Sequence, residues 1–241
     1  MKRLDVYLVE NNIIKSRAKA QELIKNNCVK VNGNIVDKCS YLVEDKDNIE
    51  IVNDICPYVS RAGLKLEGAC KEFKISMQDK VVLDIGSSTG GFTDYCLKNG
   101  AKKVYCIDVG TNQLHNLIKS NKNVVVYENT DIRSLDINLV KDVNFIVCDV
   151  SFISLTKIST KIAQVLKNGA MGIVLIKPQF ECGKTIAKKH KGIIKDKNIH
   201  KIVIDNITKD FLSKNIKILN IKESCITGTD GNVEYVVLIK S

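Results

Sequence analysis

A glycine-rich turn that follows an apolar strand is the first feature of this sequence that could do chemistry. The run VVLDIG leads into a short polar stretch and a pair of glycines before the next helical segment begins. Glycines let the backbone approach a ligand closely, and the first turn of a helix offers backbone N–H groups that have no partner within the helix. The turn therefore predicts a ligand site, whose candidate residues are Asp84, Gly86, Ser88, Thr89, Gly90, Gly91 and Phe92.

Acidic residues near the ends of later strands narrow the kind of ligand. Asp108 ends the second strand, where a carboxylate can accept both hydroxyls of a ribose, and Asp131 follows the third strand, in position to meet an adenine amino group. The glycine spacing is not G-x-G-x-x-G and no G-K-[ST] follows, which argues against dinucleotides and against P-loop nucleotides. The combination favours S-adenosyl-L-methionine (S-adenosylmethionine), with Asp149 as a further cofactor-binding candidate. The alternative is that the glycines only shape a tight turn between a strand and a helix.

Alternating strands and helices must position these residues. From residue 80 on, unbroken hydrophobic strands alternate with helical segments, and a long helix is expected between the strand GIVLI and a final pair of strands over 216–221 and 233–239. Hydrophobic strands separated by helices predict a parallel sheet that is covered on both faces. The sequence therefore predicts an α/β fold with a doubly wound, mostly parallel sheet of seven strands. The ligand site of such a sheet lies at the carboxyl ends of its strands.

The first 56 residues predict a separate small α/β unit. A helix is expected over 17–26, with Ser16 as its N-cap and Asn27 as the left-handed residue after its end. Apolar and polar residues alternate around Asn32-Gly33, which predicts a hairpin, and 48–52 would close a small sheet. The expected domains are 1–56 and 57–241, with a linker at about 53–59.

Composition and charge indicate a soluble protein with an anionic partner. The 241 residues are 44% hydrophobic, and Lys+Arg 37 against Asp+Glu 27 gives a net charge of +10. Because residues 1–56 hold nine basic and nine acidic side chains, the whole surplus lies in residues 57–241, and a polyanion is the expected partner. The nine cysteines are odd in number and include no C-x-x-C pair, so neither a disulfide framework nor a metal site is expected, and the reducing cytoplasm fits best. The charged N-terminal residues predict no signal peptide, and no apolar run is long enough to span a membrane.

Several motifs resemble those of a known family. YVSRAGLKLEGA, LDIGSSTGGFTD, CDVSFISL, IKPQFE and GNVEY are similar to the TlyA family, the S4-domain-bearing relatives of the FtsJ-like heat-shock RNA 2′-O-methyltransferases. The N-terminal RLDVYLVENNIIKSRAKAQELIKNNCVKVNGNIV resembles an S4 RNA-binding domain, although Asn27 stands where a glycine is usual. The resemblance covers nearly the whole chain. It implies a Rossmann-like S-adenosylmethionine-dependent methyltransferase fold with an S4 domain at its N-terminus.

The resemblance also implies a set of catalytic residues. Ribose 2′-O-methyltransferases of this kind use a Lys-Asp-Lys-Glu tetrad, and the matching residues here are Lys65, Asp149, Lys177 and Glu234. Lys177 is the expected base for the ribose hydroxyl, and burial, Lys65 and the cationic cofactor would favour its uncharged form. Asp149 and Glu234 would orient the two lysines. Two alternatives remain: Lys65 is an ordinary solvated lysine, or Glu181 takes the fourth place because it is nearer Lys177 in the sequence.

Basic and aromatic residues supply candidate RNA contacts. Residues 184–201 hold seven Lys and one Asp. Such a run is usually a solvated face, but its place directly after the strand that carries Lys177 makes a phosphate-contacting edge a reasonable alternative. Tyr58, Phe92, Phe152 and Phe180 could stack on a nucleotide turned out of its helix, although core packing is the preferred expectation for Phe152. The RNA-binding candidates are Arg3, Lys15, Arg17, Lys19, Lys30, Arg61, Lys184, Lys188 and Lys189.

The function that the resemblance implies is that of an rRNA (cytidine-2′-O)-methyltransferase. The chain looks like the shorter of two family forms, which implies 23S rRNA of the large subunit as substrate and an effect on sensitivity to capreomycin and viomycin. The expected partner is ribosomal RNA or a ribosomal subunit, and no protein partner is predicted. Two other classes stay open. Family members have been labelled haemolysins, which suggests a cytolysin, although neither a signal peptide nor a spanning segment is expected. The other class is an RNA-binding module with a decayed catalytic domain, against which the intact cofactor and tetrad motifs argue.

Overall fold

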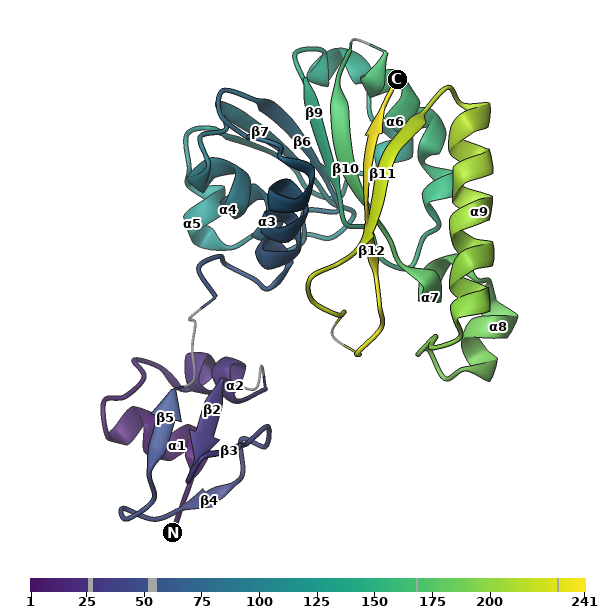
Figure 1. The fold of residues 1–241 in the computed structure, drawn as a ribbon. Coiled ribbons are helices and arrows are strands. Elements are labelled where there is room, and N and C mark those ends of the chain that lie inside the picture. The colour runs from purple at the N-terminus through teal and green to yellow at the C-terminus, as the bar shows by residue number, and fades with distance from the viewer. Residues whose placement is uncertain (26–27, 52–55, 168, 229) are drawn as a thin grey trace. The chain divides into compact units, whose positions relative to one another are not determined.

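The computed structural model describes residues 1–25, 28–51, 56–167, 169–228 and 230–241. The chain divides into two compact units, Met1–Pro57 and Tyr58–Ser241 (Figure 1). Residues 53–55 of the expected linker lie outside the described residues. Each unit has a hydrophobic core of its own, so each is described by itself.

The first unit packs two helices against short strands. Its elements are β1 (Lys2–Arg3), α1 (Leu4–Glu10), α2 (Arg17–Lys25), β2 (Val29–Val31), β3 (Asn34–Ile35), β4 (Leu42–Val43) and β5 (Ile49–Ile51). The Ser16 hydroxyl caps α2 by accepting the backbone N–H of Lys19 at 3.3 Å, as predicted. The hairpin of β2 and β3 turns at Asn32-Gly33, where both residues have positive φ, and β5 pairs with the other side of β2. The predicted helix end at 26 and the left-handed Asn27 lie outside the described residues.

The second unit is built on one sheet of seven strands in the order β11-β12-β10-β9-β6-β7-β8. Strands β8, β7, β6, β9 and β10 run parallel, whereas β12 is antiparallel to both β10 and β11. This confirms the doubly wound, mostly parallel sheet with a terminal antiparallel pair. The strands are β6 (Val81–Ile85), β7 (Lys103–Ile107), β8 (Val124–Tyr127), β9 (Phe145–Cys148), β10 (Met171–Ile176), β11 (Lys217–Glu223) and β12 (Tyr235–Lys240).

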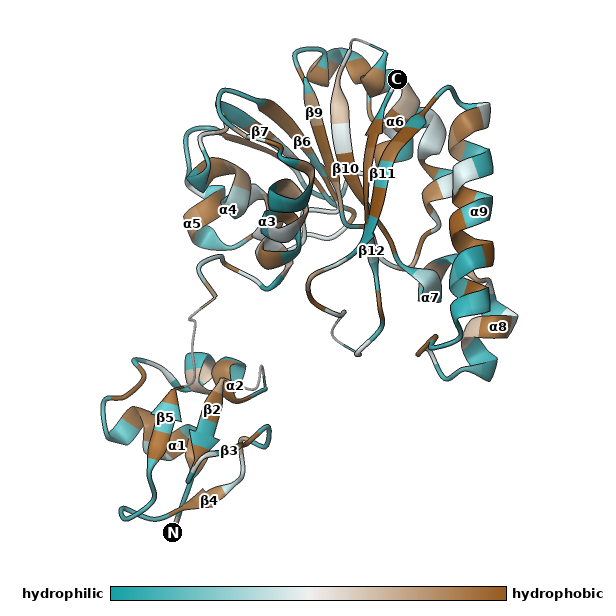
Figure 2. Ribbon diagram, in the orientation of Figure 1, coloured by the Kyte–Doolittle hydropathy of each residue, from teal (hydrophilic) through white to brown (hydrophobic). Residues whose placement is uncertain are grey.

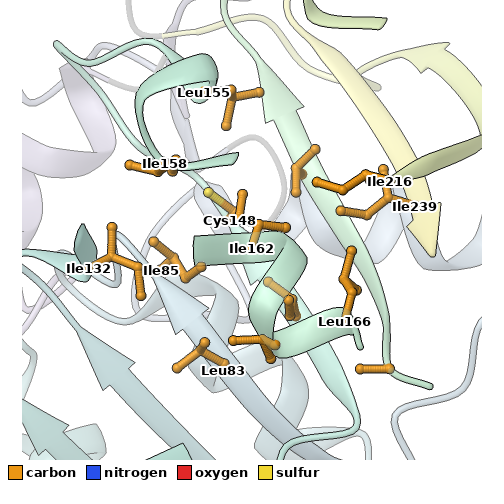
Figure 3. Close-up of a cluster of buried hydrophobic side chains, with 14 of the residues drawn as sticks. Leu83, Ile85, Ile132, Cys148, Leu155, Ile158, Ile162, Leu166, Ile216 and Ile239 are labelled. Atoms are coloured by element: carbon orange, nitrogen blue, oxygen red, sulfur yellow. The ribbon is translucent and has the colours of Figure 1, made fainter. Parts of the chain in front are cut away.

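Helices cover both faces of this sheet, because successive side chains of a buried strand point to opposite faces. On β6, Leu83 and Ile85 join one core cluster, whereas Val82 joins the other. The first cluster, part of which Figure 3 shows, includes Ile162 and Leu166 of α6 (Ser159–Leu166) and residues of α9 (Lys197–Ser213). The second cluster includes residues of α3 (Ala62–Phe73), α4 (Gly91–Lys98) and α5 (Asn116–Lys119). Figure 2 shows the corresponding brown, hydrophobic strands in the middle of the sheet.

The segment between β10 and β11 contains the predicted long helix and two short helices before it. It forms three helices, α7 (Pro178–Glu181), α8 (Lys184–Lys189) and α9. Gly183, with φ of +84°, follows α7 and is the N-cap of α8, and Gly192, with φ of +79°, lies in the loop between α8 and α9; glycine adopts such positive φ without a steric penalty. The 17-residue α9 is the predicted long helix, whereas the prediction did not include the short helices α7 and α8. The lysines of 184–201 lie on two helices and the loop between them.

Candidate active site

The carboxyl ends of the central strands bring distant motifs to one edge of the sheet. Asp149 follows β9 and Lys177 follows β10, and these strands are parallel neighbours. Glu234 directly precedes β12, whose Tyr235 pairs with Ile176 of β10, so the next position of each strand places Lys177 and Glu234 across from one another. The sheet topology therefore sets Asp149, Lys177 and Glu234 side by side, although 28 and 57 positions separate them along the chain.

Two buried ion pairs form at this edge. The Lys65 Nζ lies 2.6 Å from a Glu234 carboxylate oxygen, and the Lys177 Nζ lies 2.7 Å from an Asp149 carboxylate oxygen. The lysine side chains are only 10% and 9% exposed. Buried lysines without a partner are costly, so each carboxylate offsets the cost of burying its ammonium group. Lys65 is therefore not a solvated helix residue.

Helix α3 reaches this edge because it packs tightly against the start of α4. A Cβ on Gly91 would lie 2.2 Å from the Ser60 hydroxyl and 3.0 Å from the Ala62 Cβ, so only glycine fits there. The Asp94 carboxylate of α4 also accepts the backbone N–H of Val59 at 2.8 Å. These contacts fix the beginning of α3, and Lys65 lies on its first turn.

Glu181, the rival for the fourth place, is used elsewhere. Its carboxylate accepts the Ser154 hydroxyl at 2.5 Å and the Leu155 backbone N–H at 2.8 Å. Burial raises the pKa of Glu181 above its ordinary value, and these hydrogen bonds oppose that effect. Glu181 therefore caps the short turn at 155–157, whereas Glu234 contacts a lysine.

A cavity of about 520 Å³ opens beside the glycine turn, within the range of about 300–1,000 Å³ that small-molecule sites occupy. A smaller recess of about 140 Å³ adjoins it, and Gly86, Ser88, Asp149 and Ser151 line both. The larger cavity is also lined by Asp108, Asp131 and Phe152, and the recess by Asp84, Thr89, Gly91, Phe92 and Lys177. Among the expected cofactor residues, Gly90 lies outside both linings and serves instead as the N-cap of α4, with φ of +92°.

Gly86 shows why the turn requires glycine. Its φ is +79°, and a Cβ there would lie 3.1 Å from the Asp149 carbonyl oxygen and from a methyl group of Val150. A side chain at this position would therefore meet both steric crowding and an unfavourable backbone conformation. Gly86 therefore lines both cavities with its backbone alone.

Three carboxylates around the cavities have different environments. Asp108 accepts the backbone N–H groups of Ser88 and Gly110, each at 2.8 Å, which fixes its orientation beside the turn. Asp131 is bound by the Arg133 guanidinium, which lowers the pKa of the Asp131 carboxyl. Asp84 is fully buried; burial raises its pKa to about 7, although Thr93 donates a hydrogen bond to it at 2.6 Å.

The aromatic candidates are placed differently from the prediction. Phe152 is 90% exposed, not part of the core, and its φ of +64° turns the chain outward; its ring lies 4.8 Å from that of Phe180. Phe92 is only 2% exposed and packs in the second core cluster, so its ring is not available to stack on a base. Tyr58 packs edge-on against Tyr95 with ring centroids 5.6 Å apart. Phe152 was assigned to the core because an apolar residue is buried by default, and the sequence gives no sign of its positive φ.

Comparison with known proteins gives the family. The model of FtsJ-like methyltransferases matches residues 58–241, and that of S4 domains matches residues 2–49. The chain is 44% identical over 235 residues to "Hemolysin A" of Brachyspira hyodysenteriae, with 97% of each chain covered. It is 38% identical to "23S rRNA (cytidine-2'-O)-methyltransferase TlyA" of Campylobacter jejuni, with 95% of this chain and 96% of that protein covered. The chain belongs to the TlyA family of FtsJ-like methyltransferases.

A solved structure agrees with this assignment. A hemolysin-named protein of Streptococcus thermophilus is 33% identical, with a TM-score of 0.77, and the match covers 100% of this chain and 88% of that one. An S-adenosylmethionine-dependent methyltransferase of Mesorhizobium loti, 10% identical with a TM-score of 0.55, covers 73% of this chain and 98% of its own, which shows the fold alone. In the described residues of this TlyA-family chain, no helix is long and apolar enough to cross a membrane.

The basic candidates of the TlyA-family chain fall into two groups. In the S4 unit, Arg3 and Arg17 both bind the buried carboxylate of Asp5, and Lys19 pairs with Glu22. Within the described ranges, no ion pair forms at the S4-unit residues Lys15 and Lys30, at Arg61 before α3, or at the α8 lysines Lys184, Lys188 and Lys189. The charge of α8 is therefore not neutralised within the protein.

Two residues at the TlyA-family site were missed by sequence reasoning. Ser151 accepts a hydrogen bond from the Lys177 Nζ at 2.9 Å. Asn232, which is 1% exposed, binds the loop after α8: its side-chain oxygen accepts the Ile194 N–H and its amide donates to the Gly192 carbonyl oxygen, each at 2.9 Å. Both residues lie in motifs that carry the resemblance, CDVSF and GNVEY, and this was the only signal that could have found them.

Proposed function

We propose that this chain is an S-adenosylmethionine-dependent methyltransferase that modifies the 2′-hydroxyl of a cytidine in ribosomal RNA, with 23S rRNA as its substrate. The observation that carries the proposal is the pair of buried ion pairs, Lys65 with Glu234 and Lys177 with Asp149, at the strand edge that also lines the cavity. The relatives from Campylobacter jejuni and Mycobacterium tuberculosis are named as (cytidine-2'-O)-methyltransferases of 23S and of 16S/23S rRNA, which supports this substrate class.

The cavity suits the proposed cofactor. Gly86 leaves room for a ligand to approach the backbone, and the oriented carboxylate of Asp108 has lone pairs left to accept ribose hydroxyls. Asp131 lies in the same cavity, but its contact with Arg133 must rearrange or be shared for it to accept an adenine amino group. When bound, S-adenosylmethionine would supply a methyl group on a positively charged sulfur.

Lys177 can supply the base that the ribose hydroxyl needs in order to react. A ribose hydroxyl is a weak acid, so a base must take its proton as the oxygen attacks the methyl group. Lys177 lines the recess and is almost fully buried, so its amine can meet a ribose hydroxyl that is held there. Asp149 holds the Lys177 amine in place, and Glu234 holds Lys65 beside it. General-base assistance of this kind increases the rate of the reaction by about 10²- to 10⁴-fold. The remaining rate enhancement comes from holding the ribose oxygen and the methyl group in the correct positions.

The surroundings of the site favour an RNA substrate. The unpaired lysines of α8 follow the strand that carries Lys177, so they can neutralise phosphates near the reacting sugar. Phe152 lines the larger cavity and exposes its ring, which allows it to stack on a base turned out of its helix. Such an enzyme works in the cytoplasm, where ribosomal RNA is made and folded. Loss of the modification would then alter sensitivity to capreomycin and viomycin.

A methyl-transfer assay tests the proposal. Purified protein, labelled S-adenosylmethionine and either 23S or 16S rRNA are combined, and the labelled nucleotide is identified by mapping its ribose. We expect a 2′-O-methylcytidine in 23S rRNA, and we expect Lys177→Ala to abolish it while calorimetry still shows cofactor binding. Lys240→Ala, at the far end of β12, is the matched control because it removes an exposed lysine from the same sheet. Turnover by Lys177→Ala, or label on a base rather than a ribose, would contradict the proposal.

A membrane-acting protein remains the second candidate, because the Brachyspira hyodysenteriae relative is named a hemolysin. Leakage of vesicles that contain anionic lipid, measured with wild type and with Lys177→Ala, separates the two activities. Leakage that does not depend on Lys177 would show a membrane activity independent of methyl transfer. If no vesicles leak, methyl transfer remains the proposed function of this chain.

A further inference from the structure

The amine of Lys177 has two partners on the same short segment. Asp149 lies 2.7 Å from its Nζ, and the Ser151 hydroxyl accepts a hydrogen bond from it at 2.9 Å. The ring centroid of Phe180 is 5.9 Å away, too far to fix the amine by a hydrogen bond. The orientation of the Lys177 amine is therefore set by Asp149 and Ser151.

The number of hydrogens on an uncharged lysine makes the second partner important. An ammonium group has three N–H donors, whereas the uncharged amine that can act as a base has two N–H donors and one lone pair. Ser151 takes one N–H through a hydrogen bond, and the negative charge of Asp149, whose Oδ1 lies 2.7 Å away without forming a hydrogen bond, attracts the other N–H. The lone pair then points in the remaining tetrahedral direction. Lys177 and Ser151 both line the recess of about 140 Å³, so a substrate hydroxyl held in that recess is the expected partner of the lone pair. With Asp149 as its only partner, the amine could rotate about its Cε–Nζ bond. The lone pair would then point away from the substrate hydroxyl for much of the time.

We propose that Ser151 is a positioning residue that aims the lone pair of the Lys177 amine at the ribose hydroxyl. The inference rests on the proposed function and adds to it a role for a residue outside the tetrad. In the step, the ribose oxygen forms a bond to the methyl carbon as the methyl–sulfur bond breaks, and its proton moves to the Lys177 nitrogen. Ser151 keeps its own proton throughout and acts only as an acceptor.

The segment that carries Ser151 is anchored on both sides. Before it, the Asp149 N–H donates to the Ile85 carbonyl oxygen at 3.1 Å. After it, the Leu155 N–H donates to the Glu181 carboxylate at 2.8 Å. The sharp turn at Phe152, with φ of +64°, lies between these anchors. Because the backbone is held in this way, the Ser151 hydroxyl has a defined place rather than sampling many.

Three variants test the role. Ser151→Ala removes the acceptor, Ser151→Thr restores a hydroxyl, and Ser154→Ala is the matched control in the same segment, because it removes one bond to Glu181 and leaves the Leu155 N–H bond in place. For Ser151→Ala we expect kcat to fall by about 10- to 100-fold, the loss expected for one hydrogen bond to a reacting group. KM for RNA and calorimetric binding of S-adenosylmethionine should stay within about twofold of wild type. Ser151→Thr should recover most of the rate, and Ser154→Ala should stay near wild type.

The pH dependence of kcat separates orientation from proton affinity. On the alkaline plateau of the profile, where kcat no longer changes with pH, the deficit of Ser151→Ala should persist, because without Ser151 the lone pair is still free to rotate. A deficit that disappears on the alkaline plateau would overturn the proposal, since Ser151 would then only affect protonation. Full activity of Ser151→Ala, or an equal loss in Ser154→Ala, would also overturn it. Activity of Lys177→Ala would overturn the proposed mechanism itself, so the two failures can be told apart.

Discussion

Replacing Asp84 by asparagine should make the protein more stable, and increasingly so as pH rises. Asp84 lies on β6 with none of its surface exposed. One carboxylate oxygen accepts the Thr93 hydroxyl at 2.6 Å, while the other is buried and has no hydrogen-bond partner among the described residues. Burial raises its pKa to about 7, against 3.8 for an ordinary aspartate, and the nearby carboxylates of Asp149 and Asp108 act in the same direction. Above neutral pH the folded protein must therefore hold an unfavourable charge.

The size of the effect follows from the difference in pKa. Three pH units correspond to about 4 kcal/mol between the two protonation states. In the unfolded chain Asp84 ionises near pH 4, whereas in the folded protein it keeps its proton until about pH 7. Its contribution to the free energy of unfolding therefore falls across this interval, by up to about 4 kcal/mol, and stays low above it. Asparagine keeps the size and the acceptor for Thr93 but cannot ionise.

Urea unfolding of wild type and Asp84→Asn, at a series of pH values without cofactor, measures this contribution. The advantage of the variant should grow by up to about 4 kcal/mol between about pH 4 and pH 8. The asparagine amide can also change the stability by itself, but that change is the same at every pH. It therefore cancels when the stability difference between Asp84→Asn and wild type is compared across pH values. Asp79→Asn, at an exposed position, is the control and should give a difference that does not change with pH. A flat difference for Asp84→Asn would refute the reasoning, because it would mean that Asp84 is ionised in the folded protein at low pH, as in water.

The remaining predictions concern RNA binding and the frame of the site. Replacing the α8 lysines Lys184, Lys188 and Lys189 by alanine should reduce the slope of log affinity against log salt by about two to three, as measured by filter binding, with cofactor affinity unchanged. Phe152→Ala should weaken the RNA-dependent kcat/KM by about 5- to 100-fold without lowering the melting temperature, because the ring is 90% exposed, and Phe152→Tyr should restore activity. Asn232→Ala should lower the free energy of unfolding by about 2–4 kcal/mol in urea titrations, since it leaves the Ile194 N–H and the Gly192 carbonyl oxygen without their partners.

The sheet could be predicted from the sequence because its strands are short, buried hydrophobic runs that end in charged or glycine residues. The position of Asp108 and Asp149 at the carboxyl ends follows from that pattern and from the parallel topology. Contacts between distant residues could not be predicted in this way. Lys65 and Glu234 are 169 positions apart, and only resemblance to a family suggested that they meet.

The wrong prediction for Phe152 and the two short helices that were not predicted share a physical cause. Gly183 and Gly192 lie at the breaks on either side of α8 with positive φ, and Phe152 also has positive φ, but hydrophobic spacing carries no information on backbone conformation. Ser151 and Asn232 were missed for a different reason. Serine and asparagine occur throughout surface loops, and only the placement of a partner, the Lys177 amine or the backbone of 192–194, distinguishes these two from the rest.

The central claim is that Lys177 enables methyl transfer to a ribose of ribosomal RNA. The most direct measurement maps 2′-O-methyl groups in all ribosomal RNA from cells that carry the wild-type gene, no gene, or Lys177→Ala at the same expression level. The account predicts that one cytidine of 23S rRNA is methylated in wild-type cells and unmethylated in both other strains. An identical methylation map in the three strains, or a methyl group that persists with Lys177→Ala, would contradict it.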